Sequence, residues 1–386
     1  MNIIFAANDY TEHGGFHSYL IRVTKALNEM GHKAVIVKCG EKNAHTYDNG
    51  VEVWETAVHY YKCKYQWINM IINNIKASIC VNRKINEMAK SQKIDIIQFT
   101  SLKSVALLYF GKAPAVMRLS SYAKKCYSTD ETFSKNTVNV MSAFEIMAGK
   151  HCNAVFAPSR ATADAFEKDF HKKVHVIETP FINDVEQFDD QIVNQHLRGK
   201  KYVLFFGAMF YVKGILTIAD IIERFLEQNP DYFFVFAGKA LSINGKNAAK
   251  IVADGAGKHK DRVVFLGPLP HTQLYPVIQH ADFVVLPSIM ENFSNACIEA
   301  MYFSKVVIGT NGASFEQLID HGVNGLLCRI ADSEDLLDKM QEAVNLPKEK
   351  KRQMEFLAKK RIDRLRPEIA VRRLVRFYEK VIINSK

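Results

Sequence analysis

The chain lacks the features that mark several broad classes of protein. It has no apolar run near the ~18 residues that a membrane-spanning helix needs, and its first residues turn polar too soon for a secretion signal. Its seven cysteines include no C-x-x-C pair, its thirteen histidines show no metal-ligand spacing, and no Asp-x-Asp motif occurs. We therefore expect reduced thiols, a cytoplasmic protein, no metal site and no bound cofactor.

Size and composition indicate a folded protein of two domains. The 386 residues are 48% hydrophobic and 24% charged, and this length suits two domains of about 190 residues each. The net charge of +10 is uneven, because residues 51–150 contribute +7 and residues 348–386 contribute +9. Such basic regions suit a polyanionic partner such as anionic lipid or a charged glycan, although single basic residues are usually only solvated. We find no nucleic-acid motif and expect no nucleic-acid partner.

Short apolar strands alternate with helical patterns along most of the chain, which predicts parallel sheets with crossover helices. A polar stretch at residues 184–201 separates two runs of this pattern. We place an N-terminal domain at 1–190 and a C-terminal domain at 200–366. The expected strands are Asn2–Ala7, Ala34–Val37, Asp95–Phe99, Ala115–Leu119, Ala154–Ala157, Val174–Ile177, Tyr202–Phe206, Phe233–Ala237, Val263–Leu266, Phe283–Leu286 and Val306–Gly309.

The last segment reads as a separate helix. Pro367 interrupts a long basic helical pattern, so a kink or a new helix should begin there. Beyond it, Leu374, Phe377, Tyr378 and Val381 form an apolar stripe that needs a surface to cover.

Two glutamates follow one predicted strand. After Phe283–Leu286, a polar turn carries Glu291, and Glu299 lies eight positions on in a predicted helix. Open α/β sheets bind ligands at the carboxyl ends of their strands. A sugar nucleotide offers hydroxyls to carboxylates and a diphosphate to the N–H groups of a helix start. The pairs Glu178/Glu186 and Glu334/Glu342 share the spacing without this context, and we interpret them as solvated.

Glycine-containing turns follow other strands. Gly14-Gly15 follows the first strand, and Lys213-Gly214 precedes the helix after Tyr202–Phe206. Such turns let the backbone approach a phosphate, and a lysine at a helix start could neutralise a diphosphate. A further glycine-rich stretch runs from Gly309 through Gly312 to Glu316. Each of these segments, taken alone, could be only a turn or a solvated lysine.

The order of these motifs resembles the retaining nucleotide-sugar glycosyltransferases of family four over nearly the whole chain. The resemblance is strongest from Val203 to Leu327. It implies a GT-B fold, in which two Rossmann-like domains with parallel sheets face a central cleft. It also implies that the C-terminal helix, about 367–386, crosses back to the N-terminal domain.

The resemblance also assigns roles to residues of this chain. Lys213 and Glu291 would be catalytic, with Lys213 stabilising the departing diphosphate and Glu291 contacting the donor sugar, and Glu299 would hold the ribose. The remaining donor-binding residues would be Gly14, Gly15, Asn292, Phe293, Ser294 and Asn295. The co-substrate would be a nucleoside-diphosphate sugar, most simply a UDP-sugar. The activity would be metal-independent hexosyl transfer to a glycan or lipid-linked acceptor, in cell-surface polysaccharide or glycolipid synthesis.

Two departures from the family pattern keep alternatives open. Ala208 stands where the family has arginine, so Lys213 would act alone unless Lys239 or Lys246 helps, and Ser120 stands where the family commonly has histidine. The chain could therefore be a catalytically weak member that serves as partner or chaperone of an active transferase. A nucleotide-sugar epimerase or hydrolase on the same fold is a further alternative.

A segment of the N-terminal domain combines aromatic, basic and apolar residues. Tyr60 to Trp67 carries Lys62 and Lys64, and the helix that follows has Ile68, Ile71, Ile75 and Ile79 on one face. We favour an apolar stripe that packs into the core. The alternative, which can coexist with it, is docking on an anionic membrane, peripheral on its inner face.

Overall fold

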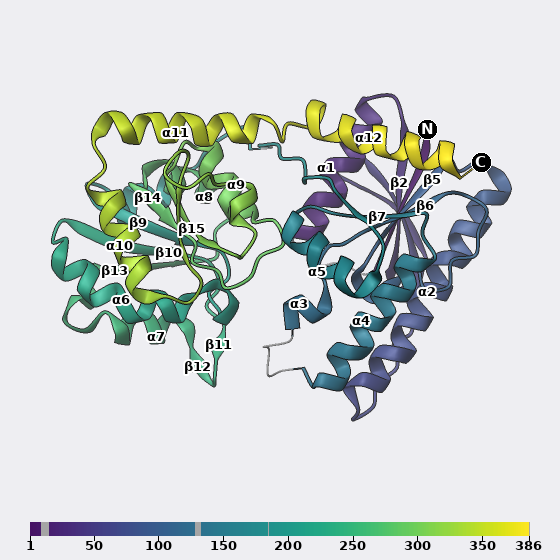
Figure 1. Ribbon diagram of the computed structural model, residues 1–386, viewed down its shortest axis with the longest axis horizontal. Coiled ribbons are helices and arrows are strands. Elements are labelled where there is room, and N and C mark those ends of the chain that lie inside the picture. The colour runs from purple at the N-terminus through teal and green to yellow at the C-terminus, as the bar shows by residue number, and fades with distance from the viewer. Residues whose placement is uncertain (9–14, 128–132, 184, 386) are drawn as a thin grey trace. The chain divides into compact units, whose positions relative to one another are not determined.

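The computed structural model describes residues 1–8, 15–127, 133–183 and 185–385 (Figure 1). It divides into two compact units. The first contains Met1–Ile182 together with Leu365–Lys386, and the second contains Asn183–Arg364. No helix among the described residues is both long and apolar enough to cross a membrane.

The first unit is built on an eight-stranded sheet, counted over the described residues. The strand order is β3-β4-β2-β1-β5-β6-β7-β8. The strands are β1 (Asn2–Ala7), β2 (Lys33–Gly40), β3 (Ala44–Asp48), β4 (Val51–Ala57), β5 (Ile96–Thr100), β6 (Ala115–Arg118), β7 (Ala154–Ala157) and β8 (Val174–Val176). The helices are α1 (Gly15–Glu29), α2 (Gln66–Ser91), α3 (Ala123–Tyr127), α4 (Lys135–Lys150), α5 (Arg160–Phe170) and α12 (Pro367–Asn384).

The second unit has a six-stranded sheet within the described part of the chain, in the order β13-β10-β9-β14-β15-β16. Its strands are β9 (Lys201–Phe206), β10 (Tyr232–Ala237), β13 (Val263–Gly267), β14 (Phe283–Val285), β15 (Val307–Asn311) and β16 (Leu326–Arg329), with a small hairpin of β11 (Ser242–Ile243) and β12 (Lys246–Asn247). Its helices are α6 (Ile215–Gln228), α7 (Ala248–Gly255), α8 (His271–His280), α9 (Asn295–Tyr302), α10 (Ser333–Val344) and α11 (Lys348–Asp363).

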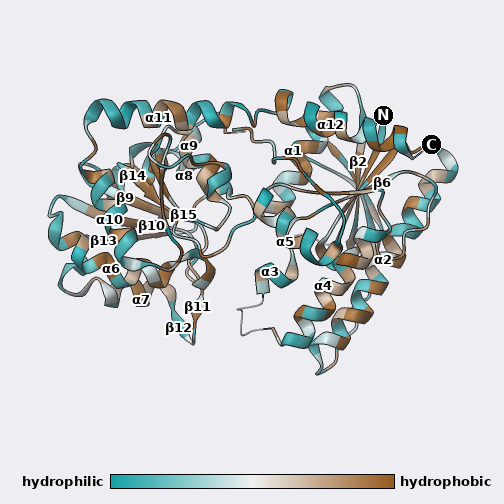
Figure 2. Ribbon diagram, in the orientation of Figure 1, coloured by the Kyte–Doolittle hydropathy of each residue, from teal (hydrophilic) through white to brown (hydrophobic). Residues whose placement is uncertain are grey.

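The strands are the most apolar part of each unit, as Figure 2 shows by colour. Their side chains fill both faces of each sheet, as expected for parallel strands covered by helices on two sides. The described strands of the second sheet pair in parallel. The prediction of two Rossmann-like α/β domains is confirmed.

The C-terminal helix belongs to the first unit, as predicted. α12 begins at Pro367 and buries Leu374, Phe377, Tyr378 and Val381 in a cluster that includes Phe5 of β1. The hydroxyl of Tyr378 donates a hydrogen bond to Oε1 of Gln98 in β5 at 2.5 Å. The apolar stripe therefore covers the sheet of the first unit.

Two predictions for the first unit need correction. β3 and β4 were not expected, and β3 runs antiparallel to β4, so the first sheet is not wholly parallel. β4 buries Val51 and Val53 in the core on one face of the sheet, while the less buried Trp54 packs against the core on the other face. α2 does pack on the core, through Val81, Ile85 and Met88, but the prediction that its isoleucine stripe faces the core is wrong. Ile79 is 51% exposed, and Ile68, Ile71 and Ile75 are only half-buried.

Candidate functional site

The site is assembled at the carboxyl ends of three adjacent strands of the second unit, β9, β14 and β15. The loop after β9 carries Lys213, and the loop after β14 carries Glu291. The backbone N–H of Ile289 donates to the carbonyl oxygen of Val212 at 2.8 Å, which ties the two loops together. The topology thus brings together side chains that are far apart in the sequence.

A glycine makes the close approach of these two loops possible. Gly214 has a φ of +74°, in the left-handed region that L side chains rarely adopt. A Cβ atom at this position would lie 1.9 Å from the carbonyl oxygen of Pro287. Gly214 therefore lets the backbone beside Lys213 lie directly against the loop that leads to Glu291.

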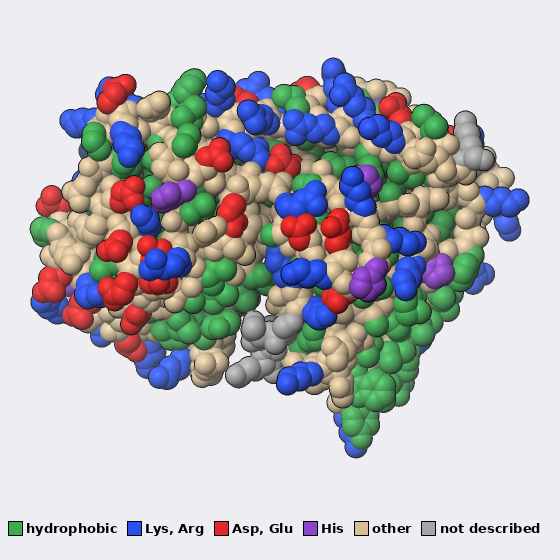
Figure 3. Space-filling view, in the orientation of Figure 1, with side chains coloured by type: hydrophobic (Ala, Val, Ile, Leu, Met, Phe, Trp, Pro, Cys, Tyr) green, Lys and Arg blue, Asp and Glu red, His purple; other side chains and the backbone are tan. Residues whose placement is uncertain are grey.

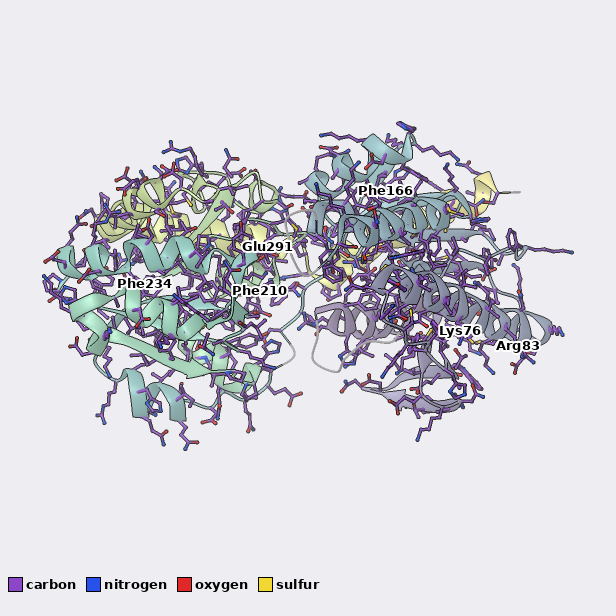
Figure 4. The ribbon with its side chains drawn as sticks, turned by 90° about the horizontal axis from the view of Figure 1, so that it is seen from below. Lys76, Arg83, Phe166, Phe210, Phe234 and Glu291 are labelled. Carbon is purple, nitrogen blue, oxygen red and sulfur yellow. The ribbon has the colours of Figure 1, made fainter. Side chains whose placement is uncertain are left out.

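Lys213 and Glu291 form an ion pair. Lys213 Nζ lies 2.5 Å from Glu291 Oε1, and the side chains are 29% and 12% exposed. The same carboxylate oxygen accepts a hydrogen bond from Ser288 Oγ at 3.0 Å. Figure 4 labels Glu291 near Phe210, whose carbonyl accepts from the backbone N–H of Lys213. A cation and an anion thus lie in contact, partly open to solvent.

Hydroxyl groups at the end of β15 and in the glycine-rich stretch after it hold the backbone of the turn that carries Glu291. Ser314 Oγ donates to the backbone carbonyl oxygen of Glu291 at 2.9 Å, and Thr310 Oγ1 donates to that of Ser288. Both hydroxyl residues are buried, with exposed fractions of at most 4%. They fix the backbone on both sides of the turn, so the position of Glu291 is determined by hydrogen bonds from a third strand end.

The helix after this turn starts at the site. Ser294 is the N-cap of α9, and its hydroxyl accepts a hydrogen bond from the N–H of Cys297. Glu299 lies in the second turn and is buried, with Oε1 3.6 Å from Nε2 of His271, the first residue of α8. The His271 ring stacks on Tyr275, with ring centroids 5.0 Å apart. A buried carboxylate next to an imidazole is thus held beyond the helix start.

The arrangement suits binding of an anionic, hydroxyl-rich ligand more than covalent catalysis. The start of α9 and the ammonium of Lys213 favour negative charge, and the two carboxylates can accept hydrogen bonds from hydroxyls. Burial, and then the charge of Glu291, raise the pKa of the Cys297 thiol, so this cysteine is no activated nucleophile. Among the described residues, no group of three or more His, Cys, Asp or Glu could hold a metal ion.

The other sequence-predicted residues are distributed over both units. Phe293 and Ser294 are buried in the turn before α9, Asn292 is half-buried in that turn, and Asn295 is half-buried as the first residue of the helix. Because its hydroxyl caps the helix, the Ser294 side chain is already engaged. Gly15 begins α1 in the first unit, while Gly14 lies outside the described residues.

The two departures from the family pattern occupy strand ends. Ala208 follows β9, and the next residue, Met209, donates its N–H to the carbonyl of Lys239, whose side chain is exposed. Ser120 follows β6 in the first unit. Its hydroxyl lies 3.1 Å from that of Thr100 and 3.3 Å from Nη1 of the buried Arg118. A neutral hydroxyl beside a guanidinium therefore stands where the family commonly has histidine.

Sequence reasoning missed the residues that hold the site in place. Ser288, Thr310 and Ser314 lie inside the motifs that identified the region, but nothing in their spacing indicated contacts to Glu291 and its backbone. His271 lies in another segment of the chain, and only the structure brings it to Glu299.

Family models of glycosyltransferases match both halves of the chain. Residues 13–182 match the model "Glycosyltransferase Family 4", and residues 187–361 match the model "Glycosyl transferases group 1". The chain is also 25% identical, over 188 residues, to a lipopolysaccharide core biosynthesis mannosyltransferase of Rhizobium leguminosarum. That alignment covers 48% of this chain and 53% of the mannosyltransferase, so the chain spans about half the length of this curated relative.

Solved structures match the whole chain at low sequence identity. Sucrose-phosphate synthase from Thermosynechococcus elongatus has a TM-score of 0.77 at 15% identity, over 100% of both chains. HepE from Anabaena, solved with UDP and glucose, has a TM-score of 0.74 at 18% identity, over 98% of this chain and 100% of that one. These likenesses establish the fold. Together with the two family models, they place the chain among the glycosyltransferases of the GT-B fold.

Proposed function

We propose that the protein is a retaining glycosyltransferase that uses a nucleoside-diphosphate sugar, with UDP-sugar as the first candidate. The acceptor would be a glycan or a lipid-linked saccharide, in the synthesis of a cell-surface polysaccharide or glycolipid. The observation that carries this proposal is the contact of Lys213 with Glu291 beside the start of α9. It combines a cation, a carboxylate and helix N–H groups, which are the groups that a diphosphate and a sugar require.

Each residue of the site has a role in the proposal. Lys213 would leave Glu291 to bind the diphosphate, and Glu291 would then accept hydrogen bonds from the sugar hydroxyls. The backbone N–H groups of residues 292–295 would bind phosphate oxygens. Glu299, buried in the second turn of α9, would accept hydrogen bonds from the ribose hydroxyls. Gly14 and Gly15 of the first unit would contribute backbone groups to the phosphates.

The proposed reaction exchanges one bond at the anomeric carbon for another. The bond to the diphosphate oxygen breaks, and the acceptor oxygen forms its bond on the same face of the sugar, which retains the configuration. The departing diphosphate takes up the proton of the acceptor hydroxyl. Lys213 and the start of α9 would stabilise the charge on the diphosphate, so the proposed step requires no metal ion.

Two similar proteins support this choice of donor. Anabaena HepE was solved in complex with UDP and glucose, and the Rhizobium relative is named a mannosyltransferase. One protein that this chain resembles thus binds a nucleotide and a sugar, and another is named for the transfer of a sugar. The departures at Ala208 and Ser120 bear on the rate of transfer more than on donor binding, since Lys213 and Glu299 are both present.

Thermal unfolding with UDP, GDP and ADP tests donor binding. A nucleotide at about a hundred times its Kd should stabilise a domain the size of the second unit by roughly 5 to 10 °C. Glu299→Gln should remove most of this shift, because the amide cannot accept both ribose hydroxyls as the carboxylate does. Glu342→Gln, a half-buried glutamate of α10 paired with Lys339, is the control and should keep the shift. An unchanged shift in Glu299→Gln would reject the ribose assignment.

Turnover of the donor distinguishes the proposal from its alternatives. A panel of nucleotide sugars is incubated with acceptor extracts, and both the free nucleotide and the glycosylated product are measured. Transfer with retained configuration supports the proposal. Free nucleotide with free sugar would indicate a hydrolase instead, and nucleotide binding without any turnover would indicate a partner protein of an active transferase.

A further inference from the structure

The first half of α2 leaves its large apolar residues at the surface, whereas the second half buries Val81, Ile85 and Met88 in the core. The first half of this helix carries seven large apolar side chains, none of which is buried: Trp67, Ile68, Met70, Ile71, Ile72, Ile75 and Ile79. Trp67 is 40% exposed and Ile79 is 51% exposed. The residues buried on the other side include Asn74, Ser78 and Asn82. This is the reverse of the usual pattern for a surface helix.

Hydrogen bonds explain why polar side chains face inward on α2. Ser78 Oγ donates to the carbonyl oxygen of Val105 and accepts from the N–H of Leu108, both at 2.9 Å. Asn82 Nδ2 also donates to the carbonyl of Val105, at 3.0 Å. The turn after β5 therefore depends on polar residues of α2. This requirement fixes the rotation of the helix and turns its apolar side outward.

α4 repeats this arrangement next to α2. It packs against α2, and Thr137 Oγ1 near its start donates to Oε1 of Gln66 at the start of α2. α4 buries Ser142 and Glu145, whereas four apolar residues, Val140, Met141, Phe144 and Met147, stay half-buried or exposed. Figure 3 shows hydrophobic side chains gathered over this part of the first unit. We call the exposed apolar residues of α2 and α4 the apolar face.

The surroundings of the apolar face are basic. The chain has no Asp or Glu between Glu55 and Glu87, whereas this stretch carries Lys62, Lys64, Lys76, Arg83 and Lys84. Figure 4 labels Lys76 and Arg83, two turns apart on α2. α4 holds one carboxyl group, that of Glu145, which is 5% exposed. Glu87, in the last part of α2, is exposed and pairs with Lys84 at 3.0 Å, so the acid-free part of the surface is the loop and the first half of the helix.

The loop before α2 is held in a fixed conformation next to this face. Asn73 exchanges two hydrogen bonds with the backbone of Tyr61, at 2.7 and 2.9 Å. Asn69 does the same with Cys63, at 2.7 and 2.8 Å. Up to Trp67, the exposed side chains of this loop other than Gln66 are basic or aromatic: Tyr61, Lys62, Lys64 and Tyr65. The loop thus presents lysines and interfacial aromatic residues without a large loss of conformational freedom on binding.

We propose that the apolar face and this loop form a docking surface for a membrane that contains anionic lipid. The apolar residues of α2 and α4 would enter the boundary between headgroups and acyl chains. Tyr61, Tyr65 and Trp67 would lie at the headgroup level, and Lys62 and Lys64 would contact lipid phosphates. Charge decides between occupants, because the loop and the first half of α2 carry lysines and no acidic residue, which fits an anionic membrane and repels a second copy of the same surface.

Binding to vesicles tests the proposal with the whole chain. We expect the protein to sediment with vesicles of phosphatidylcholine and phosphatidylglycerol, to bind vesicles of phosphatidylcholine alone only weakly, and to be released by added salt. The fluorescence of Trp67 should shift to the blue on binding, and Trp67→Phe should abolish this shift, since the chain has only one other tryptophan. Absence of sedimentation with anionic vesicles at low salt would overturn the proposal.

Matched variants separate charge from apolar contact. Lys62→Gln with Lys64→Gln should weaken vesicle binding roughly 30-fold, while Lys42→Gln with Lys250→Gln should leave it unchanged. Trp67→Ser with Ile79→Ser should weaken it by about tenfold or more. The control for the latter is Val323→Ser with Ile330→Ser, since these side chains have similar exposed fractions of 51% and 36%. Equal binding by test and control pairs would overturn the proposal.

The oligomeric state tests the competing occupant. If the apolar face joins two copies of the chain, size-exclusion chromatography with light scattering should reveal a dimer that Trp67→Ser with Ile79→Ser dissociates, and this would overturn membrane docking. The inference rests on the proposed function only for the lipid-linked acceptor that the surface would serve. Vesicle binding needs neither donor nor acceptor, and the nucleotide-induced thermal shift needs no vesicles, so either can fail alone.

Discussion

Replacing Glu291 by Gln should affect nucleotide binding and sugar transfer in opposite directions. In the structure, Lys213 is paired with Glu291 at 2.5 Å. If Lys213 binds the diphosphate, this pair must open whenever a nucleotide enters. Glu291→Gln removes the charge that holds the lysine and keeps an oxygen that can accept from Ser288. The nucleotide should then bind more tightly, while the donor sugar loses a charged hydrogen-bond acceptor.

The size of both effects follows from the burial of the pair. The Lys213 and Glu291 side chains are 29% and 12% exposed. We therefore expect their ion pair to stabilise the nucleotide-free site by about 1 to 2 kcal/mol, which is more than a surface salt bridge contributes. Loss of this charge interaction should strengthen binding of a nucleoside diphosphate by roughly fivefold to thirtyfold. A hydrogen bond from a charged group is worth about 1.5 to 3 kcal/mol, so transfer should fall by roughly 10-fold to 150-fold.

Calorimetric titration with UDP measures the first effect, and initial rates with the nucleotide sugar measure the second. Glu334→Gln is the control, because Glu334 of α10 forms a pair of similar length with Arg224 at 2.6 Å, in which both side chains are well exposed. This variant should change neither quantity. Weaker UDP binding in Glu291→Gln, in parallel with the loss of transfer, would show that Glu291 itself holds the nucleotide and would refute the competition for Lys213.

Two further predictions concern the folded state. Gly214→Ala should lower the Tm and reduce the nucleotide-induced shift, because its Cβ would meet the carbonyl oxygen of Pro287. The control is Gly322→Ala, which has a φ of +75° and no atom within 4 Å of its Cβ, and which should lower the Tm without changing the nucleotide-induced shift. Equal nucleotide-induced shifts in the two variants would contradict this prediction. Burial raises the pKa of Glu145 from 4.5 to about 8, so its carboxyl group is protonated in the folded state and ionised in the unfolded chain between these values. The free energy of unfolding should therefore fall as the pH rises from about 5 to about 8, and it should fall by about 3 kcal/mol more in the wild type than in Glu145→Gln. Urea denaturation across this pH range measures both proteins, and an equal pH dependence of the two would contradict the raised pKa.

Most of the strands could be predicted because each is a short apolar run bounded by polar turns. Runs such as Asn2–Ala7 and Ala154–Ala157 are buried on both faces, so their composition alone identifies them. β3 was missed because it lies at the sheet edge and its sequence, Ala-His-Thr-Tyr-Asp, has no buried residue. An edge strand that packs on little leaves no apolar signal in the sequence.

The residues of the site that belong to sequence motifs could be predicted, whereas the contacts that hold them in place could not. Lys213, Glu291 and the start of α9 lie at strand ends, which the alternation of strands and helices predicts, and the structure brings Lys213 and Glu291 into contact. The hydrogen bonds of Ser288 and Ser314 were not predictable, because they depend on loop conformations. The close contact between Gly214 and Pro287 was not predictable either. A glycine before a helix is common, and only the position of Pro287 makes a glycine necessary here.

The orientation of α2 shows the limit of reading a helix by periodicity. The spacing of Ile68, Ile71, Ile75 and Ile79 identifies an apolar side, but it does not say what that side contacts. The rotation of α2 about its axis is set by the backbone groups of Val105 and Leu108, which need hydrogen-bond partners from the helix. Rotating α2 to bury its isoleucines would remove Ser78 and Asn82 from these groups, at about 1 to 3 kcal/mol for each group left unsatisfied. The helix therefore keeps Ser78 and Asn82 inward, and the apolar side of its first half remains at the surface.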